Sequence, residues 1–290
     1  MQLSLLHFND LHGRFDQLPR LFTLIQRARL SAQHKGFQSL LLEAGDSSAR
    51  EVWESKATQG RANFALLEAM GVQANVLGNA EIQSWGREAL TKLVASVHFS
   101  VLAANLLDLA DPTRPAVPKL KASLVMEIEG FSVGLVGVTA AFRDDYEAFG
   151  YLAEDPLETL PREIAALKAQ GAKLIILLSH LGVRQPEEEP RPALLTDDKI
   201  AAAFPEIGVI VGGHSHSVLQ TPLVVGETLI VQAGSHGRYL GQLDLTLDSD
   251  NGRILDYTYT LHSAEHAAPD STIASVVDLV REEAARLRER

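Results

Sequence analysis

The chain has 290 residues and a formal net charge of −11, because 37 acidic residues outnumber 26 lysines and arginines. This balance disfavours nucleic acid polymers as partners, since binding them needs clustered basic side chains that release counterions. Cysteine is absent, which excludes disulfide bonds and thiolate metal ligands. The length is sufficient for one large domain or for two.

The N-terminus has only a short apolar run with no basic residue before it, unlike a secretory leader. No stretch reaches the ~20 apolar residues that a membrane span requires. We therefore expect a protein of the cytoplasm with no membrane partner. Oligomeric state has no signature in the sequence.

Strands and helices alternate along the first half of the chain. Buried strands are predicted at residues 3–8, 39–43, 74–77 and 99–103, and helices at residues 19–33 and 60–70. Further on we predict a hairpin at 124–139, a helix at 156–170, and strands at 173–178, 208–211 and 228–232. A last hairpin joins 242–247 to 254–261, and a helix covers 270–290. The pattern predicts an α/β fold with one mixed sheet, or with two sheets packed together and helices outside.

Side chains able to bind metal ions stand where these apolar runs end. They are Asp10, His12, Asp46, Asn79, His180, His214 and His216. Ligands of open α/β sheets bind at the carboxyl edge of the strands, so residues far apart in sequence can converge there. Seven donors are more than one metal ion can use, whereas two ions that share a carboxylate can use them. Because such a pair clamps the attacking and leaving oxygens of a displacement at phosphorus, we expect a hydrolase of phosphate esters or anhydrides.

Five motifs, in this order, resemble those of the calcineurin-like metallophosphoesterases, and most closely those of the 5′-nucleotidase group. They are Asn-Asp-x-His-Gly (9–13), Gly-Asp (45–46), Gly-Asn-x-Glu (78–81), Ser-His-x-Gly (179–182) and Gly-Gly-His-Ser-His (212–216). The resemblance implies a four-layer fold in which two packed mixed sheets lie between helices. It also implies a catalytic domain over residues 1–268 and a C-terminal helix at 269–290 that packs on it or extends from it. The nucleoside-binding C-terminal domain that often follows in this group is not expected.

The resemblance further implies two divalent metal ions with separate ligands. It assigns Asp10, His12 and His216 to one ion, Asn79, His180 and His214 to the other, and Asp46 to a bridge between them. Oxygen and nitrogen ligands without thiolate suit Mn, Fe, Co, Ni or Zn rather than calcium. A hydroxide held between the ions would attack phosphorus in line with the leaving oxygen. The expected partner is a small phosphorylated substrate, with nucleotides among the candidates.

The sequence departs from the family pattern at two positions. The family's His–Asp dyad stabilises the transition state or protonates the leaving group, but here its positions hold Ala80 and Gln83. Lost acid–base assistance costs ~10²–10⁴-fold in rate, and most for poor alkoxide leaving groups. We therefore expect a hydrolase that prefers anhydrides or aryl esters, or a slow enzyme whose substrate supplies the proton. The alternative is a catalytically silent metal- or nucleotide-binding protein that regulates a partner.

Further residues are assigned from their position alone. His236 follows a predicted strand at the same sheet edge, and it is either the missing imidazole or an ordinary loop histidine. Arg14 and Arg50 lie four residues after matched carboxylates, as phosphate contacts or as surface arginines. Glu81 is interpreted as a partner that orients the ligands. The loop at 182–196 is either a lid over the site or a solvated connection.

Overall fold

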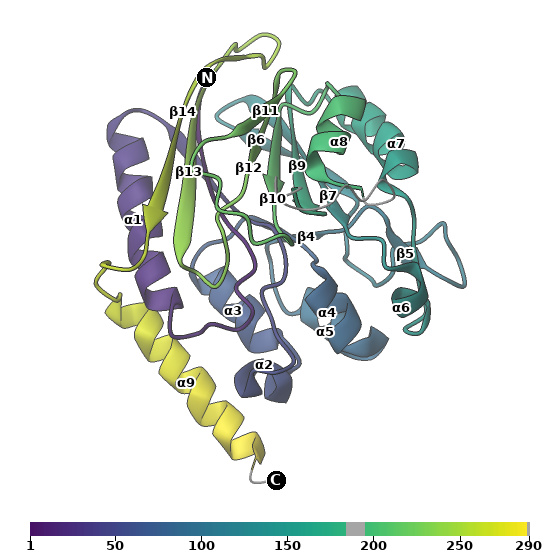
Figure 1. Cartoon of the computed structure of the whole chain (residues 1–290), viewed down its shortest axis with the longest axis vertical. Helices are drawn as coiled ribbons and strands as arrows, with labels where there is room; N and C mark the ends of the chain where they lie inside the picture. The colour runs from purple at the N-terminus through teal and green to yellow at the C-terminus, as the bar shows by residue number, and fades with distance from the viewer. Residues whose placement is uncertain (184–194, 289–290) are drawn as a thin grey trace.

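Two mixed sheets pack face to face between layers of helices in the computed structural model, which describes residues 1–183 and 195–288 (Figure 1). The first sheet consists of β14 (Ile254–Ser263), β13 (Tyr239–Leu247), β1 (Gln2–Phe8), β2 (Gln38–Glu43), β3 (Ala74–Val76) and β4 (Ser100–Leu102), in this order. The second consists of β11 (Leu223–Val225), β12 (Thr228–Val231), β10 (Val209–Gly212), β9 (Leu174–His180), β7 (Phe131–Thr139) and β6 (Ser123–Ile128). The predicted fold class is confirmed.

Parallel strands form the centre of each sheet. β1 to β4 run parallel to one another, and β13 joins β1 in the antiparallel sense. In the second sheet β7, β9, β10 and β12 are parallel, with β6 and β11 as antiparallel edges. Each sheet therefore presents the carboxyl ends of several strands at one edge, and the two edges lie side by side.

The alternation of side chains along the strands explains why three apolar layers form. Leu5 of β1 and Leu42 of β2 point between the sheets, where they meet Ile176 of the second sheet. The neighbouring Leu6 and Leu41 point to the opposite face, where helices cover them. All five side chains are fully buried. Burial on both faces is the reason why these strands read as continuous apolar runs.

Helices cover the outer faces of both sheets. α1 (Leu18–His34), α3 (Arg61–Ala69) and α5 (Gly86–Ala95) pack on the first sheet, whereas α7 (Pro156–Ala169) and α8 (Asp197–Ala203) pack on the second. The short helices α2 (Trp53–Thr58), α4 (Asn79–Ser84) and α6 (Arg143–Glu147) lie in connections, and β5 (Leu106–Asp108) pairs with β8 (Tyr151–Ala153). The C-terminal helix α9 (Ser271–Arg288) runs along α1, α2 and α3 (Figure 1).

Each strand and helix predicted from periodicity is present, with ends that differ by a few residues. Elements of three to seven residues, such as β5, β8 and α8, were not predicted because they are too short to show a period. The ten-residue helix α5 was also not predicted, although Leu90, Leu93 and Val94 lie on its buried face. The division of the chain at residue 268 stays a prediction. Most of the loop proposed as a lid lies outside the described residues. None of the helices in the described part of the chain is long and apolar enough to cross a membrane.

Candidate metal centre

The predicted metal ligands lie at the carboxyl edges of both sheets. Asp10 and His12 follow β1, Asp46 follows β2, Asn79 begins α4 after β3, His180 ends β9, and His214 and His216 follow β10. Because the sheets stack with these edges side by side, one sheet contributes four of the residues and the other sheet contributes three. The packing of the sheets thus decides which residues meet.

The ligand loops are joined by backbone hydrogen bonds and adopt an unusual conformation. The Asp10 amide donates to the Gly45 carbonyl, and the His12 amide donates to the Asp46 carbonyl, both at 2.9 Å. Of the nine non-glycine residues with positive φ in the described chain, five are in these loops, namely Asp10, His12, Asp46, His214 and His216, and a sixth, His236, is in the neighbouring loop after β12. Such backbone costs energy and persists where the surrounding structure imposes it, typically at functional sites.

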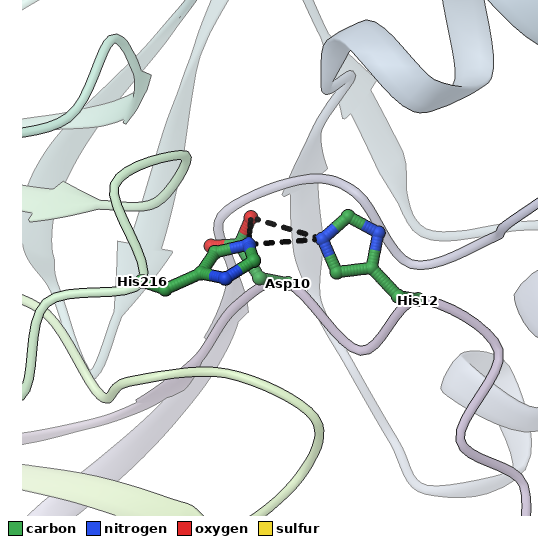
Figure 2. A group of neighbouring side chains, drawn as sticks. All are labelled: Asp10, His12 and His216. Atoms are coloured by element: carbon green, nitrogen blue, oxygen red, sulfur yellow. Dashed lines mark hydrogen bonds and ion pairs between the residues drawn. The ribbon is translucent and has the colours of Figure 1, made fainter.

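Asp10, His12 and His216 form a first group of ligand atoms (Figure 2). Asp10 Oδ1 lies 3.6 Å from His12 Nε2 and 3.2 Å from His216 Nε2. The two imidazole nitrogens are 3.0 Å apart. Three donor atoms that converge in this way suit a cation that accepts nitrogen and oxygen ligands.

Asp10, Asp46 and His180 form a second, fully buried group. Asp46 Oδ2 lies 3.3 Å from His180 Nε2 and 3.8 Å from His12 Nε2, so one carboxylate oxygen stands between the two groups. His180 Nδ1 is 2.6 Å from the Ala44 carbonyl, to which it donates. That bond fixes a proton on Nδ1, so a cation that displaces the second proton would bind at Nε2, which faces the carboxylates.

Three buried polar atoms support a fit to metal ions. Asp10 Oδ1, Asn79 Oδ1 and His180 Nε2 make no hydrogen bond within the described part of the chain. Buried polar atoms without partners are costly and rare in folded proteins, and metal ligation would satisfy all three. His214 lies beside His180, with ring centroids 5.2 Å apart, but it belongs to neither compact group.

The charges of the centre compensate one another in the absence of a cation. Burial raises the pKa of Asp10 and Asp46, but the surrounding imidazoles outweigh it and hold both pKa values below the usual range. Burial lowers the pKa of His180, but the carboxylates, first Asp46 and then Asp10, reverse this and raise it to about 10. Burial and the neighbouring His180 lower the pKa of His214 to about 4. The carboxylates thus favour positive charge at the place where a cation would bind.

Glu81 orders the loop that carries Asp46. Its buried carboxylate accepts hydrogen bonds from the amides of Asp46 (3.2 Å), Gly78 (3.1 Å) and Ser48 (2.8 Å), and from the Ser48 hydroxyl (2.9 Å). Burial, followed by the charge of Asp46, raises the pKa of Glu81 to about 7. The contacts agree with the interpretation of Glu81 as a residue that orients a ligand.

Two glycines permit the close approach of the ligand loops. A Cβ atom on Gly78 would lie 2.1 Å from Asp46 Oδ1 and 2.4 Å from the Asp46 amide. A Cβ atom on Gly213 would lie 2.3 Å from the Ala44 carbonyl and 2.8 Å from His180 Nδ1. Neither contact leaves room for a side chain, so glycine is required at both positions.

The position of the absent dyad lies beside Asp46. The Ala80 amide donates to Asp46 Oδ1 at 2.7 Å, and Gln83 Nε2 donates to Asp145 Oδ2 at 2.9 Å. His236 lies beside the first ligand group, with its ring centroid 5.6 Å from that of His12 and 5.6 Å from that of His216. That His236 replaces the missing imidazole stays a prediction.

The two arginines singled out in the sequence differ in placement. Arg14 is exposed and lines a cleft together with His236, whereas Arg50 is exposed and lines none of the described clefts near the centre. On the opposite side, a cleft of about 320 Å³ is bordered by His214 and Phe142, whose ring centroids are 5.9 Å apart.

Several residues around the centre were not assigned from the sequence. Asn9 Nδ2 donates to Asp10 Oδ2 at 2.7 Å, and its position next to Asp10 could have suggested this. Buried Asp197 accepts from the Ser179 hydroxyl at 2.5 Å, beside His180. Phe142 and Asp197 have no motif around them, so the sequence offered no signal.

Comparison with known proteins assigns this arrangement to a class. The chain belongs to the calcineurin-like phosphoesterase family, whose model matches residues 3–218. The resemblance inferred from the five motifs is thereby confirmed.

Among curated proteins, the uncharacterized metallophosphoesterase YunD of Bacillus subtilis is 34% identical over 250 residues, covering 86% of this chain and 51% of that protein. A 5′-nucleotidase of Diplobatis ommata is 30% identical over 282 residues, covering 85% of this chain and 46% of that protein. The chain thus spans about half the length of the curated relatives it matches.

Among solved structures, a 5′-nucleotidase precursor from Thermus thermophilus has a TM-score of 0.82 at 24% identity, covering all of this chain and 60% of that one. The calcineurin-like phosphoesterase YfkN of Bacillus subtilis has a TM-score of 0.80 at 19% identity, with 99% of each chain covered. These likenesses show the shared fold.

Proposed function

We propose that the chain hydrolyses small phosphate esters or anhydrides with two divalent cations held by the candidate metal centre. The observation that carries this proposal is the shared geometry of the two ligand groups. Asp10 belongs to both groups, and Asp46 Oδ2 lies within 4 Å of an imidazole nitrogen from each. A single mononuclear site would not need both carboxylates in this position.

Each residue has a distinct task in this mechanism. Asp10, His12 and His216 would hold one cation, while His180, Asn79 and His214 would hold the other, with Asp46 between them. The cations would activate water and neutralise charge on the phosphoryl oxygens. Asn9 donates to the Asp10 carboxylate, and Glu81 accepts from the backbone amide of Asp46. These bonds hold the ligand loops in place, so that little reorganisation is needed during the reaction.

The absence of the dyad shapes the substrate preference. Ala80 and Gln83 have no group that titrates, so they cannot protonate a leaving alkoxide. Leaving groups that depart as stable anions, such as phosphates and phenolates, need no such proton. We therefore propose that the substrates of the chain are activated phosphates, and nucleotides are among the compounds to be tested. Its location in the cytoplasm stays a prediction.

A metal-supplemented assay tests the proposal. Aryl phosphate, its diester, a nucleoside monophosphate and a nucleotide sugar are offered with Mn²⁺ to the wild type, to Asp46→Asn and to the exposed control Asp278→Asn. We expect turnover in the wild type and the control, and loss of at least ~10²-fold in Asp46→Asn. Equal turnover of Asp46→Asn and the control would refute the bridging role.

The missing dyad also favours a second function, that of a regulatory protein which binds a metal or a nucleotide without catalysis. This alternative predicts micromolar or tighter binding of a nucleotide to the Mn²⁺-loaded chain with no turnover of any phosphate compound. Direct binding measured alongside the assay separates the two functions.

A further inference from the structure

A cleft of about 530 Å³ opens beside the metal centre, between the start of α1, the loop after β12 and the end of β14. Its charged lining consists of Arg14, Arg20, Arg238, His236, Asp16 and Glu265. Three guanidinium groups therefore face two carboxylates, in a chain whose net charge is −11. The cleft is a local concentration of positive charge on an acidic protein.

The three arginines use only a few of their N–H groups in hydrogen bonds within the described residues. Arg238 donates to the Ser235 carbonyl at 3.3 Å and to the Ser235 hydroxyl at 3.2 Å, and Arg20 donates to the Ala267 carbonyl. None of the three forms an ion pair within the described residues. Each guanidinium carries five N–H groups, so most remain available to an anion. The bonds of Arg20 and Arg238 hold their side chains in place, which lowers the entropy lost when a ligand binds.

The cleft adjoins the first ligand group directly. His236 lines it, and its ring centroid is 5.6 Å from those of His12 and His216. The His236 amide donates to the Asp10 carbonyl at 2.7 Å, which ties the cleft wall to the metal-binding loop. An anion in the cleft would therefore lie next to a phosphoryl group at the metal centre.

We propose that this cleft is a second anion subsite, built by Arg14, Arg20 and Arg238, for the phosphoryl group that adjoins the one held at the metal centre. The substrate class would then be a phosphoanhydride, meaning a compound with two linked phosphoryl groups. The inference rests on the proposed function, because it assigns a substrate class to the same site.

The proposal explains how a chain without the dyad releases its product. The oxygen of water bonds to the terminal phosphorus, and the bond from that phosphorus to the bridging oxygen breaks. The electron pair stays on the bridging oxygen, which departs as part of the second phosphate, and the proton of water passes to solvent. Guanidinium groups neutralise the charge that the leaving phosphate gains, so no acid is required.

The subsite can be tested by binding without turnover. Methylenediphosphonate and methylphosphonate are titrated calorimetrically into the Mn²⁺-loaded protein, freed of excess metal. The variants are Arg14→Ala and Arg238→Ala, with Arg27→Ala as the control, since Arg27 is an exposed arginine on α1 that lines no described cleft. Thermal unfolding of each variant verifies that it is folded, and Arg14→Lys serves as a milder second change.

We expect the wild type to bind the diphosphonate at least ~10-fold more tightly than the monophosphonate, because one charge-assisted hydrogen bond usually strengthens binding by about this factor. Arg14→Ala and Arg238→Ala should each weaken diphosphonate binding about tenfold and leave monophosphonate binding within about twofold. Arg14→Lys should fall between the wild type and Arg14→Ala, and Arg27→Ala should match the wild type.

Two outcomes would overturn the subsite. One is equal affinity of the wild type for both phosphonates, and the other is an equal loss in Arg14→Ala and Arg27→Ala, which would reflect net charge alone. Failure of the proposed function has a different signature, namely no turnover of any phosphate compound by the metal-loaded wild type. Turnover with the same KM for anhydrides and monoesters would refute the subsite and leave the proposed function intact.

Discussion

Replacement of Glu81 by glutamine should weaken both the fold and the metal centre. Each carboxylate oxygen of Glu81 accepts two hydrogen bonds, one oxygen from the Asp46 and Gly78 amides and the other from the Ser48 amide and hydroxyl. The amide of glutamine accepts on one side only, so two buried donors lose their partner in either orientation. Each such donor costs about 1–3 kcal/mol.

The charge of Glu81 offsets part of this loss. Its pKa is raised to about 7 by burial and by the carboxylate of Asp46, so glutamine also removes a repulsion at neutral pH. We expect a net decrease of about 2 kcal/mol in the free energy of unfolding at pH 7, and a decrease of Mn²⁺ affinity by about 10–100-fold. Urea unfolding of the metal-free protein gives the first quantity, and metal titration gives the second.

The exposed Glu88→Gln serves as the matched control and should change neither quantity. If Glu81→Gln leaves both the unfolding midpoint and the Mn²⁺ affinity at their wild-type values, the hydrogen bonds of Glu81 do not organise the loop of Asp46. A loss of stability at unchanged metal affinity would limit Glu81 to a structural role.

Three further predictions concern the same centre. Asp46→Asn should lower the Mn²⁺ content from two ions to one or none by elemental analysis, and a retained content of two would exclude Asp46 as a shared ligand. Ala80→His combined with Gln83→Asp should raise turnover of nucleoside monophosphates about 10²-fold. Asp145→Asn is added because Gln83 donates to the Asp145 carboxylate, which would repel an aspartate at position 83. No gain in a folded, metal-loaded variant would mean that another group already supplies the proton. Burial and the charge of Glu81 raise the pKa of Glu43 from 4.5 to about 8, so the unfolded state releases this proton first as pH rises. The metal-free wild type should therefore lose stability between pH 4.5 and 8 relative to Glu43→Gln, by about 3 kcal/mol at pH 7, and parallel pH profiles in urea unfolding would contradict the assignment.

Most of the longer elements, with the exception of α5, could be predicted because their burial pattern is written in the sequence. Residues of β1 and β9 are buried on both faces and appear as continuous apolar runs, and the glycines after the strands mark sharp turns. Short elements such as β11 and α6 could not be predicted, because their conformation is set by neighbouring strands and loops rather than by their own residues.

The sequence by itself determined three things about this protein: which of the longer strands form, which side chains are able to bind metal ions, and that the dyad is absent at Ala80 and Gln83. Only the tertiary structure decided that Asp10 belongs to both ligand groups and that His236 lies beside His12 and His216. It also brought Arg14, Arg20 and Arg238 to one cleft. These relations depend on how the two sheets stack and how loops from distant strands pack, and neighbours in space leave no periodic signal in a single sequence.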